Sequence, residues 1–551
     1  MMQAKRSFAV LCLAVVLGLA SLACGSSPSI LPSNAVAIEV RANTSLTPWL
    51  SSAVAAFNKA NVKTSGGRPV FVNLSTAESG QAVIDMSAGG ELPALWIADN
   101  EVWVNVLADQ GQASFQGQCA SVAQSPMVIA LWQPIAESLG WPGRSLGWLD
   151  IGSLAADPPA WAYYSGGQFG SALRIGHTHP GLSATGANTL LAVVQAAQSK
   201  TEAVTAAEIQ QPIVQASVGT FEGAVAWFST STEQLGQTMR ERGISYLGAA
   251  VVYESTVVNY GGGDPALVPI YPFEGTFMAT HPACVNSADS PEAQEAALLF
   301  RDYLLKKEAQ QLAVANGLRP VSTEVTLGAP LDAAHGVDLS QPKVIFGQPS
   351  VETLYAAQAL WQAARKDVYL VMLLDTSGSM SGDKMEAMRQ SAIQFVQQMG
   401  DDDFITVISF ASQPTVLVYN QQVGPARPEI IKALQAMQAV GKTAMYDAIG
   451  EGARLVAESS SSQRSNAMVV LTDGKDNSSV TYRFNQQLIA AATAHDTTVF
   501  TIAYGADAEK ESMTELASRA NGNFYLGTEA NIAAIYQEMS AAFGGSVGIG
   551  R

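Results

Sequence analysis

The sequence predicts an α/β protein made of more than one folded unit, and three observations support this. Apolar, strand-like runs alternate with helix-like stretches along most of the chain, which is typical of sheets covered by helices. The chain has 551 residues, whereas one hydrophobic core rarely serves more than about 300 residues. Hydrophobic residues make up 48% of the chain and charged residues 14%, so there is enough apolar surface for several packed cores.

The N-terminus has the features of an export signal. Two basic residues precede an apolar stretch, residues 7–23, which is shorter than the roughly 20 residues that span a membrane as a helix. The stretch ends in Ala23 and Cys24 and is followed by Gly and Ser residues, and in this it resembles a bacterial lipoprotein cleavage site. The resemblance implies that Cys24 is lipidated and anchors the chain on the extracytoplasmic side of a membrane. Ser21 departs from the leucine that is usual in that family, and cleavage after Ala23 to give a secreted protein is the alternative.

The net charge limits the possible partners, and the cysteine content bears on a possible disulfide. The formal net charge is −17, and nucleic-acid binding is excluded because it needs a clustered basic face that the sequence lacks. Apart from the signal peptide and Cys24, two cysteines remain. Cys119 and Cys284 form either a disulfide, as suits an exported protein, or two buried thiols.

The first large unit alternates strands and helices. Residues 37–40 and 70–74 are predicted strands, each followed by a polar loop and then a helix, which indicates an α/β domain with a mostly parallel sheet. A second block runs from about residue 161 to 252, after which residues 268–277 return to a sequence pattern like that of the first block. This pattern predicts two lobes. A stretch rich in Gly, Pro and Asp, about residues 323–349, is the predicted linker to the last unit.

The C-terminal unit is predicted to be a doubly wound α/β domain. Residues 368–374 form an apolar run suited to a central parallel strand covered on both faces. Strands and helices alternate after it, with strands expected at 404–410, 467–471 and 498–503, and helices at 385–399, 444–457, 485–495 and 530–542. The chain is thus expected to divide into a signal peptide (1–23), a spacer (24–35), a two-lobed domain (36–322), a linker with a connecting helix (323–366) and a C-terminal domain (367–546).

A set of oxygen-bearing side chains follows the first strand of the C-terminal domain. Asp375, Ser377 and Ser379 stand at alternate positions of a tight loop, so they can converge on one point. Thr443 precedes a later helix and Asp473 ends a later strand, which places both at the same edge, where open α/β sheets bind ligands. Hard oxygen ligands of this kind suit Mg²⁺, Mn²⁺ or Ca²⁺.

These five residues resemble the metal-ion-dependent adhesion site of von Willebrand factor A domains, and the resemblance covers about residues 367–543. It implies a Rossmann-like fold and one bound divalent cation. A cation with only two nearby carboxylates stays electrophilic towards a third, so a partner's Asp or Glu would fill the remaining place. By this likeness the ion is held directly by the hydroxyls, and directly or through water by the carboxylates, of Ser377, Ser379, Thr443, Asp375 and Asp473.

Residues 36–321 look like a periplasmic solute-binding domain of the two-lobed type that serves bacterial importers. Hydroxyl-bearing loops before helices carry the likeness, because helix N-termini attract anions and polar solutes. The resemblance implies a small polar or anionic solute clamped between the lobes. Turns and caps of this kind also occur in proteins with no such site, and His177 and His179 are expected to be loop residues. The candidate contacts are Thr44, Ser45, Ser79, Gly80, Ser183, Thr185 and Tyr253.

No pattern in the sequence predicts an enzyme. Neither Ser377 nor Ser379 has a base beside it, and a phosphatase of this layout would have a second carboxylate where Ser377 stands. The sequence therefore predicts metal-ion-dependent protein binding or adhesion at the cell envelope. The alternative is a solute-capture component of a transport system that docks to its partner through the C-terminal domain.

Overall fold

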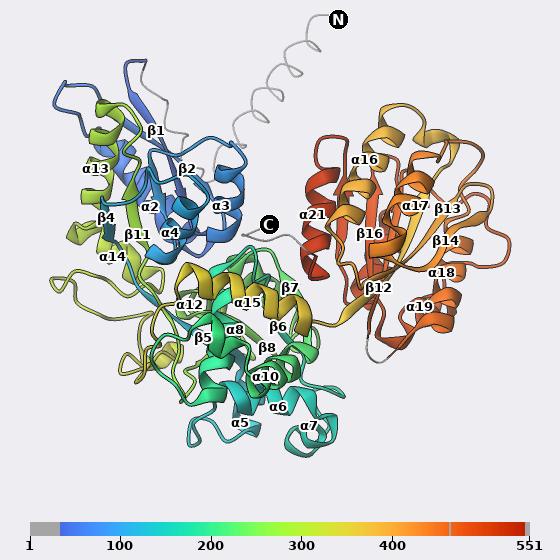
Figure 1. The fold of residues 1–551 in the computed structure, drawn as a ribbon, viewed down its shortest axis with the longest axis horizontal. Coiled ribbons are helices and arrows are strands. Elements are labelled where there is room, and N and C mark those ends of the chain that lie inside the picture. The colour runs from blue at the N-terminus through green and yellow to red at the C-terminus, as the bar shows by residue number, and fades with distance from the viewer. Residues whose placement is uncertain (1–32, 462–463, 546–551) are drawn as a thin grey trace, which may run out of the picture.

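The structure, a computed structural model, describes residues 33–461 and 464–545, which form three sheets covered by helices (Figure 1). Two of the sheets belong to the two lobes of the N-terminal part, and the third belongs to the C-terminal unit. The expectations for the signal peptide and for lipidation of Cys24 lie outside the described residues. In the described part of the chain, none of the helices has the length and apolar character needed to span a bilayer.

The first lobe is built on a five-stranded sheet with the order β2-β1-β3-β11-β4. β1 pairs in parallel with β2 and β3, whereas β11 runs antiparallel to β3 and β4. Trp49 and Phe57 of α2 are fully buried in the core of this lobe. Its elements are β1 (Val36–Ala42), α2 (Thr47–Ala60), β2 (Val70–Thr76), α3 (Ser79–Ser87), β3 (Leu95–Ile97), α4 (Glu101–Asp109), β4 (Cys119–Ser121), β11 (Pro282–Val285), α13 (Pro291–Leu304) and α14 (Lys307–Ala315).

A disulfide joins the edge strand β4 of this lobe to its neighbour β11. Cys119 in β4 lies opposite Cys284 in β11 in the antiparallel register. The structure bonds the two cysteines, whose Cα atoms are 4.1 Å apart. Because the bond links positions separated by 165 residues, it closes a long loop and restricts the unfolded chain.

The second lobe has a mixed sheet with the order β10-β5-β8-β6-β7, and β9 lies beside β5. Only the β8–β6 and β6–β7 pairs are parallel, so the expected mostly parallel sheet holds for part of this lobe. All eight residues of β5 are buried. Its elements are β5 (Ser125–Trp132), α5 (Gln133–Ser138), α6 (Trp148–Ala156), α7 (Pro158–Ser165), β6 (Ile175–Thr178), α8 (Ala184–Gln198), α9 (Ala206–Ile209), α10 (Pro212–Gly223), β7 (Val225–Ser229), α11 (Thr232–Arg242), β8 (Ala249–Tyr253), α12 (Glu254–Tyr260), β9 (Leu267–Ile270) and β10 (Met278–Ala279).

Two expectations for this lobe were wrong. The second block was expected to begin near residue 161, but it begins at β5, because a continuously apolar strand does not reveal which sheet it joins. His177 and His179 were expected in a loop; His179 does lie just after β6, outside regular structure, but His177 is in the strand, and both side chains are buried. His177 is part of β6, with Nε2 at 3.1 Å from Oε1 of Glu222.

The C-terminal unit has a six-stranded sheet with the order β14-β13-β12-β15-β16-β17, parallel except for the β13–β14 pair. Leu370 and Met372 of β12 pack with α16, α17 and α21 on one face, while Tyr369 and Val371 pack with α18, α19 and α20 on the other. This double coverage explains the continuous apolar run. The elements are β12 (Asp367–Asp375), α16 (Asp383–Gln398), β13 (Phe404–Phe410), β14 (Pro414–Gln422), α17 (Val423–Gln435), α18 (Met445–Ser459), β15 (Arg464–Thr472), α19 (Gln486–Ala492), β16 (Thr498–Tyr504), α20 (Glu511–Arg519), β17 (Phe524–Gly527) and α21 (Ile532–Ala542).

The segment between the two parts is packed against the N-terminal part. Leu331, Val337 and Phe346 of the predicted linker are buried. The helix that follows, α15 (Val351–Ala364), contacts α8, α9 and α10 of the second lobe and α4 of the first. α15 therefore touches both lobes before the chain enters the C-terminal unit (Figure 1).

Candidate functional site

The motif residues of the C-terminal unit lie at the carboxyl edge of its sheet. Asp375 is the last residue of β12, and Asp473 directly follows β15. Because β12 and β15 are parallel neighbours, their ends bring the two carboxylates to the same edge. Ser377 and Ser379 lie in the loop after β12, and Thr443 precedes α18.

Hydrogen bonds connect four of these residues. The hydroxyls of Ser377 and Ser379 are 3.0 Å apart, and the Ser379 hydroxyl donates to Oδ1 of Asp473 at 2.6 Å. Asp375 accepts from the backbone N–H of Ser377 at 2.7 Å and from the Thr472 hydroxyl at 2.5 Å. Both carboxylates are buried.

The fifth residue, Thr443, lies beside this set. Its backbone N–H donates to Oδ1 of Asn477 at 2.9 Å. Its hydroxyl is 3.6 Å from the position that a Cβ atom on Gly474 would take, and Gly474 directly follows Asp473. The Thr443 hydroxyl therefore lies next to the loop that carries one of the two carboxylates.

A basic side chain that the sequence did not single out also reaches the site. Nζ of Lys384, in the first turn of α16, donates to Oδ2 of Asp473 at 2.6 Å. Its side chain is 33% exposed, whereas that of Asp473 is fully buried. The sequence feature that could have identified Lys384 is its closeness to the motif, since α16 begins soon after the motif loop. The ammonium gives Asp473 the positive charge that a bound cation would also supply.

The chemistry of the site fits a hard divalent cation. Burial raises the pKa of Asp375, although hydrogen bonds from Thr472 and Ser377 oppose the rise. A buried carboxylate of this kind is stabilised by a nearby cation. The described residues include no group of three or more His, Cys, Asp and Glu side chains that could hold a metal ion. A metal here would therefore depend on the hydroxyls as well as on the carboxylates, which suits Mg²⁺, Mn²⁺ or Ca²⁺.

Two exposed apolar side chains flank this edge. Val440 is 67% exposed and Val480 is 81% exposed. The backbone N–H of Val440 donates to the carbonyl of Thr376, inside the motif loop, at 2.7 Å. The backbone N–H of Val480 donates to Asp447 of α18 at 2.9 Å. Both valines thus stand on loops that are fixed to the elements carrying the motif.

The residues predicted to contact a solute lie where the two lobes meet, but most of them bind carboxylates of the protein itself. Two acidic residues that the sequence did not single out, Glu78 and Asp99, accept these hydrogen bonds. The Ser183 hydroxyl donates to Glu78 at 2.6 Å, and the hydroxyls of Ser79 and Tyr253 each donate to Asp99 at 2.5 Å. Thr44 donates to Glu78 as well.

The remaining predicted contacts have other partners. Ser45 donates to the side chain of Asn43 at 2.6 Å, so it stabilises its own loop. The hydroxyls of Thr185 and Thr232 are 2.8 Å apart. A Cβ on Gly80 would come within 2.7 Å of the carbonyl oxygen of Leu182, so the glycine allows the two lobes to touch.

Comparison with known families agrees with this architecture. The profile of the bacterial extracellular solute-binding protein family matches residues 38–319, which is more than half of the chain. The chain belongs to this family. The profile of the von Willebrand factor type A domain matches residues 370–538, so this member of the solute-binding family carries a type A domain at its C-terminal end.

Two curated proteins share part of the sequence. Uncharacterized protein sll0103 of Synechocystis sp. is 27% identical over 176 residues, which are 32% of this chain and 41% of that protein. Inter-alpha-trypsin inhibitor heavy chain H3 of Bos taurus is 30% identical over 117 residues, 20% of this chain and 13% of that protein. The chain thus matches less than half the length of either relative.

Solved structures are similar to each part of this solute-binding-family protein. The sulfate-binding protein SubI from Mycobacterium tuberculosis is 18% identical, with a TM-score of 0.39, and the match covers 58% of this chain and 96% of that one. A von Willebrand factor type A structure from Catenulispora acidiphila is 22% identical, with a TM-score of 0.30, over 32% of this chain and 42% of that one. These likenesses concern the fold alone.

Family membership has two direct consequences. An extracellular solute-binding family implies that the chain is exported. Solute-binding proteins and type A domains are typically binding proteins without catalytic activity.

Proposed function

We propose that this protein grips an acidic side chain of a partner protein through a divalent cation held by its type A domain. The observation that carries the proposal is the gathering of Asp375, Ser377, Ser379 and Asp473 in one hydrogen-bonded set with Thr443 beside it. The three hydroxyls would hold the ion directly, and the two carboxylates directly or through water. The ion would supply positive charge for a carboxylate from outside the chain.

The surroundings of the site suit a protein partner. Val440 and Val480 project into solvent beside the motif loops. Apolar contacts around a charged pair exclude water from it and strengthen it. We therefore place the partner's acidic residue at the edge of the sheet, with apolar side chains of the partner covering the two valines.

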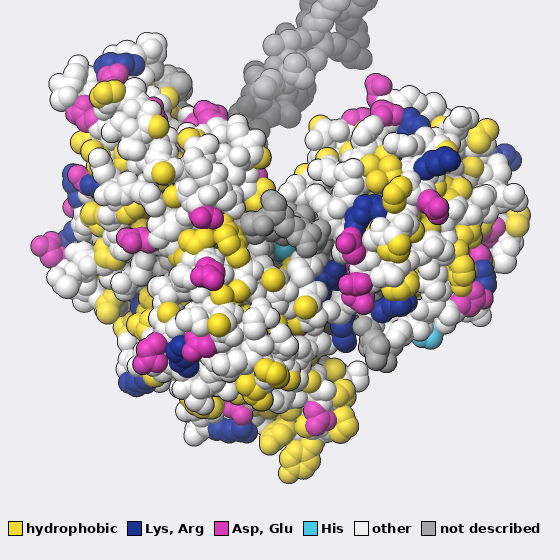
Figure 2. Space-filling model, viewed as in Figure 1, with side chains coloured by type: hydrophobic (Ala, Val, Ile, Leu, Met, Phe, Trp, Pro, Cys, Tyr) yellow, Lys and Arg dark blue, Asp and Glu magenta, His cyan; other side chains and the backbone are white. Residues whose placement is uncertain are grey.

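The charge distribution supports a protein partner over nucleic acid. On the face shown in Figure 2, lysines and arginines of the described residues are interspersed with aspartates and glutamates. The formal net charge is −17, which repels a phosphate backbone. A lipid on Cys24 would keep the exported protein at the membrane, so that the type A domain works in adhesion at the cell envelope.

Cation binding is tested by thermal unfolding. Mg²⁺ or Mn²⁺ should raise the melting temperature of the exported protein by several degrees, because an ion at 100 times its Kd contributes about 2.7 kcal/mol to the folded state. Asp473→Asn and Thr443→Val remove one ligand each with little change in volume, and both should abolish the rise.

Asp383→Ala is the matched control. Asp383 is an exposed aspartate in the first turn of α16, and this variant should keep the full cation-induced rise. Partners captured from the cell envelope by the wild type should be released by a chelator and should not be captured by Asp473→Asn. An unchanged cation response in Asp473→Asn and Thr443→Val would refute the proposed site.

A further inference from the structure

The contact between the two lobes is centred on one carboxylate. Glu78 stands directly before α3 in the first lobe and is 2% exposed. From the second lobe it accepts hydrogen bonds from the hydroxyl of Ser183 at 2.6 Å and from the backbone N–H of Thr232 at 2.8 Å. From its own lobe it accepts from the hydroxyl of Thr44 and from the side chain of Asn43. Both carboxylate oxygens are thus engaged, and donors from both lobes hold them.

These donors form the kind of site that holds an anion. Thr232 is the first residue of α11, and Ser183 directly precedes α8, so the carboxylate lies at the positive ends of two helices. Ser183 and Thr232 are fully buried. Glu78 therefore occupies a place between the lobes where a small oxyanion would find the same donors.

A second carboxylate makes this place unfavourable for an additional anion. Asp99, fully buried, accepts from Tyr253 of the second lobe at 2.5 Å and from Ser79 and Asn43 of the first at 2.5 Å and 2.9 Å. All the hydrogen-bond partners of Glu78 and Asp99 in the described chain are neutral donors. An anionic solute would therefore meet two acidic groups and donors that are already in use.

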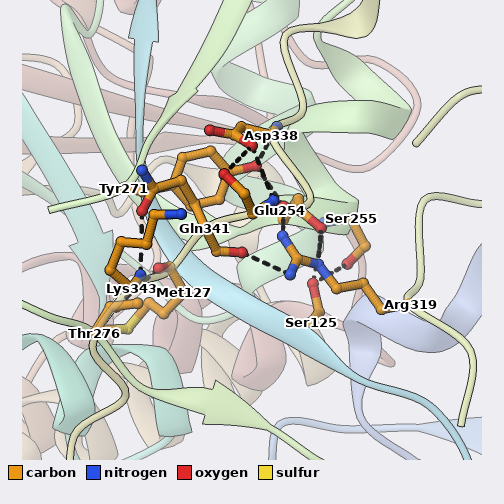
Figure 3. Close-up of polar contacts among 11 residues, drawn as sticks. Ser125, Met127, Glu254, Ser255, Tyr271, Thr276, Arg319, Asp338, Gln341 and Lys343 are labelled. Carbon is orange, nitrogen blue, oxygen red and sulfur yellow. Dashed lines mark hydrogen bonds and ion pairs between the residues drawn. The ribbon is translucent and has the colours of Figure 1, made fainter. Parts of the chain in front are cut away.

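An ion pair also joins the two lobes. Figure 3 shows the guanidinium of Arg319, at the end of the first lobe, facing the carboxylate of Glu254, at the start of α12 in the second. The two ion-pair distances are 2.8 Å and 2.6 Å. Arg319 also donates to the carbonyl of Gln341 in the linker at 2.7 Å. Arg319 thus connects the first lobe, the second lobe and the linker at one place.

α15 holds the lobes together on another side. The hydroxyl of Tyr355 donates to Asp109 of α4, in the first lobe, at 2.9 Å. The hydroxyl of Thr353 donates to the carbonyl of Val204, in the second lobe, at 3.1 Å. The loop before α8 also accepts a hydrogen bond from α3, between Gln81 and Leu182, at 2.9 Å. Opening of the lobes would break each of these contacts.

We propose that Glu78 is a built-in ligand of the two-lobed domain, which replaces an external anion and keeps the lobes closed without solute. The domain then serves as a rigid support that presents the type A domain. The metal site plays no part in this inference, which stands on the lobe contacts alone.

Chemical rescue of a variant tests the built-in ligand. Glu78→Ala removes the carboxylate and leaves its donors unpaired, so the variant should melt several degrees below the wild type. Sodium acetate or sodium sulfate should then raise its melting temperature by several degrees in a saturating manner, relative to sodium chloride at equal ionic strength. The wild type should show no saturating component, only the gradual rise with concentration that excluded anions give to any folded protein.

Two further variants serve as controls. Glu78→Gln keeps the volume but turns an amide group towards the donors, so it should lose stability without being rescued by anions. Glu91→Ala removes an exposed glutamate of the same lobe and should keep both the melting temperature and the acetate response of the wild type. Loss of stability without rescue in Glu78→Ala would count against an anion site.

Small-angle X-ray scattering of the wild type decides the matter even if Glu78→Ala does not fold. The radius of gyration should be the same in chloride, acetate and sulfate. A decrease on addition of either anion, or scattering that fits only an open arrangement in chloride, would overturn the proposal, because the lobes would then be open and waiting for solute.

Discussion

The ion pair between Lys384 and Asp473 bears directly on the strength of cation binding. The ammonium lies 2.6 Å from Oδ2 of Asp473, and this carboxylate is one of only two that the proposed metal site contains. A divalent ion and the ammonium would repel one another at that distance. Lys384 thus substitutes for the positive charge of the ion when no ion is bound.

Removal of this lysine should tighten cation binding. Lys384→Met keeps the length of the side chain and removes its charge, so we expect the Kd for Mg²⁺ or Mn²⁺ to fall about tenfold, which corresponds to ~1.4 kcal/mol. Isothermal titration calorimetry measures the change. Lys475→Met, at an exposed lysine of the loop after Asp473, is the control and should change the Kd little. Weaker binding by Lys384→Met would mean instead that the lysine positions Asp473 for the ion.

Asp99 gives the interlobe contact a dependence on pH. Burial, together with the charge of neighbouring Glu78, raises the pKa of Asp99 from 3.8 to about 7. The other titratable groups at this contact are Tyr253, which donates to Asp99, and His281, whose ring lies 5.9 Å from that of Tyr253. Burial lowers the pKa of His281 to about 4, so this ring is neutral over most of the range in which Asp99 titrates.

The sign of the pH effect follows from the raised pKa. Between pH 3.8 and about 7 the folded protein holds a proton on Asp99 that the unfolded chain has released, so this group stabilises the fold at low pH and loses its effect as the pH rises towards 7. The melting temperature of the wild type should fall more steeply over this range than that of Asp99→Asn. Glu233, whose pKa burial also raises to about 7, is present in both proteins and cancels in the comparison.

A control variant separates this effect from general acid stability. Asp302→Asn, at an aspartate of α13 whose side chain is 59% exposed, should follow the wild-type curve. Parallel curves for the wild type and Asp99→Asn would show that Asp99 does not take up the proton.

At the scale of the elements, strands with a clear apolar pattern were predictable, whether mainly one face is buried, as in β1 and β2, or both faces, as in β12. β12 could be predicted from its apolar run, because its successive residues pack alternately into the cores on the two faces of the sheet. β14 has mostly exposed or half-buried residues along an antiparallel edge, and β17 is only four residues long. Neither strand has an apolar pattern that distinguishes it from an ordinary loop.

The two candidate sites differed in how far the sequence could predict them. Four residues of the proposed metal motif follow two predicted strands and Thr443 precedes a predicted helix, so their meeting at one sheet edge could be expected. Glu78 and Asp99 could not be found in this way, because each lies in a short polar loop. Their role depends on hydrogen-bond donors of the second lobe, which are Ser183, Thr232 and Tyr253. The sequence signal was an acidic residue one or two positions before a helix of the first lobe, which also describes many ordinary helix starts.

At the scale of the molecule, the type A domain is attached to the second lobe by side-chain contacts as well as by the chain. The rings of Trp227 in β7 and Phe500 in β16 are stacked with centroids 5.7 Å apart. The guanidinium of Arg242 donates a hydrogen bond to Oδ1 of Asn523 at 3.0 Å. Nε2 of His179 is hydrogen-bonded to the carbonyl oxygen of Gly545 at 2.8 Å. These contacts join the type A domain to the second lobe and set the orientation of the sheet edge that carries the proposed metal site.

The orientation of the type A domain relative to the second lobe should therefore depend on Trp227. Trp227→Ala removes a ring that is 8% exposed, and the lost packing should weaken the contact by on the order of 3 kcal/mol. We expect a larger maximum dimension in small-angle scattering and faster hydrogen exchange in β7 and α21, with the cation-induced rise in melting temperature unchanged because the metal edge is formed within the type A domain. Tyr163→Ala, at a tyrosine that is 83% exposed on the second lobe, controls for loss of an aromatic ring and should change neither quantity. If Trp227→Ala kept the wild-type dimensions and exchange rates, the stacked rings would not be what holds the two parts together, and the hydrogen bonds of Arg242 and His179 to the type A domain would have to do so.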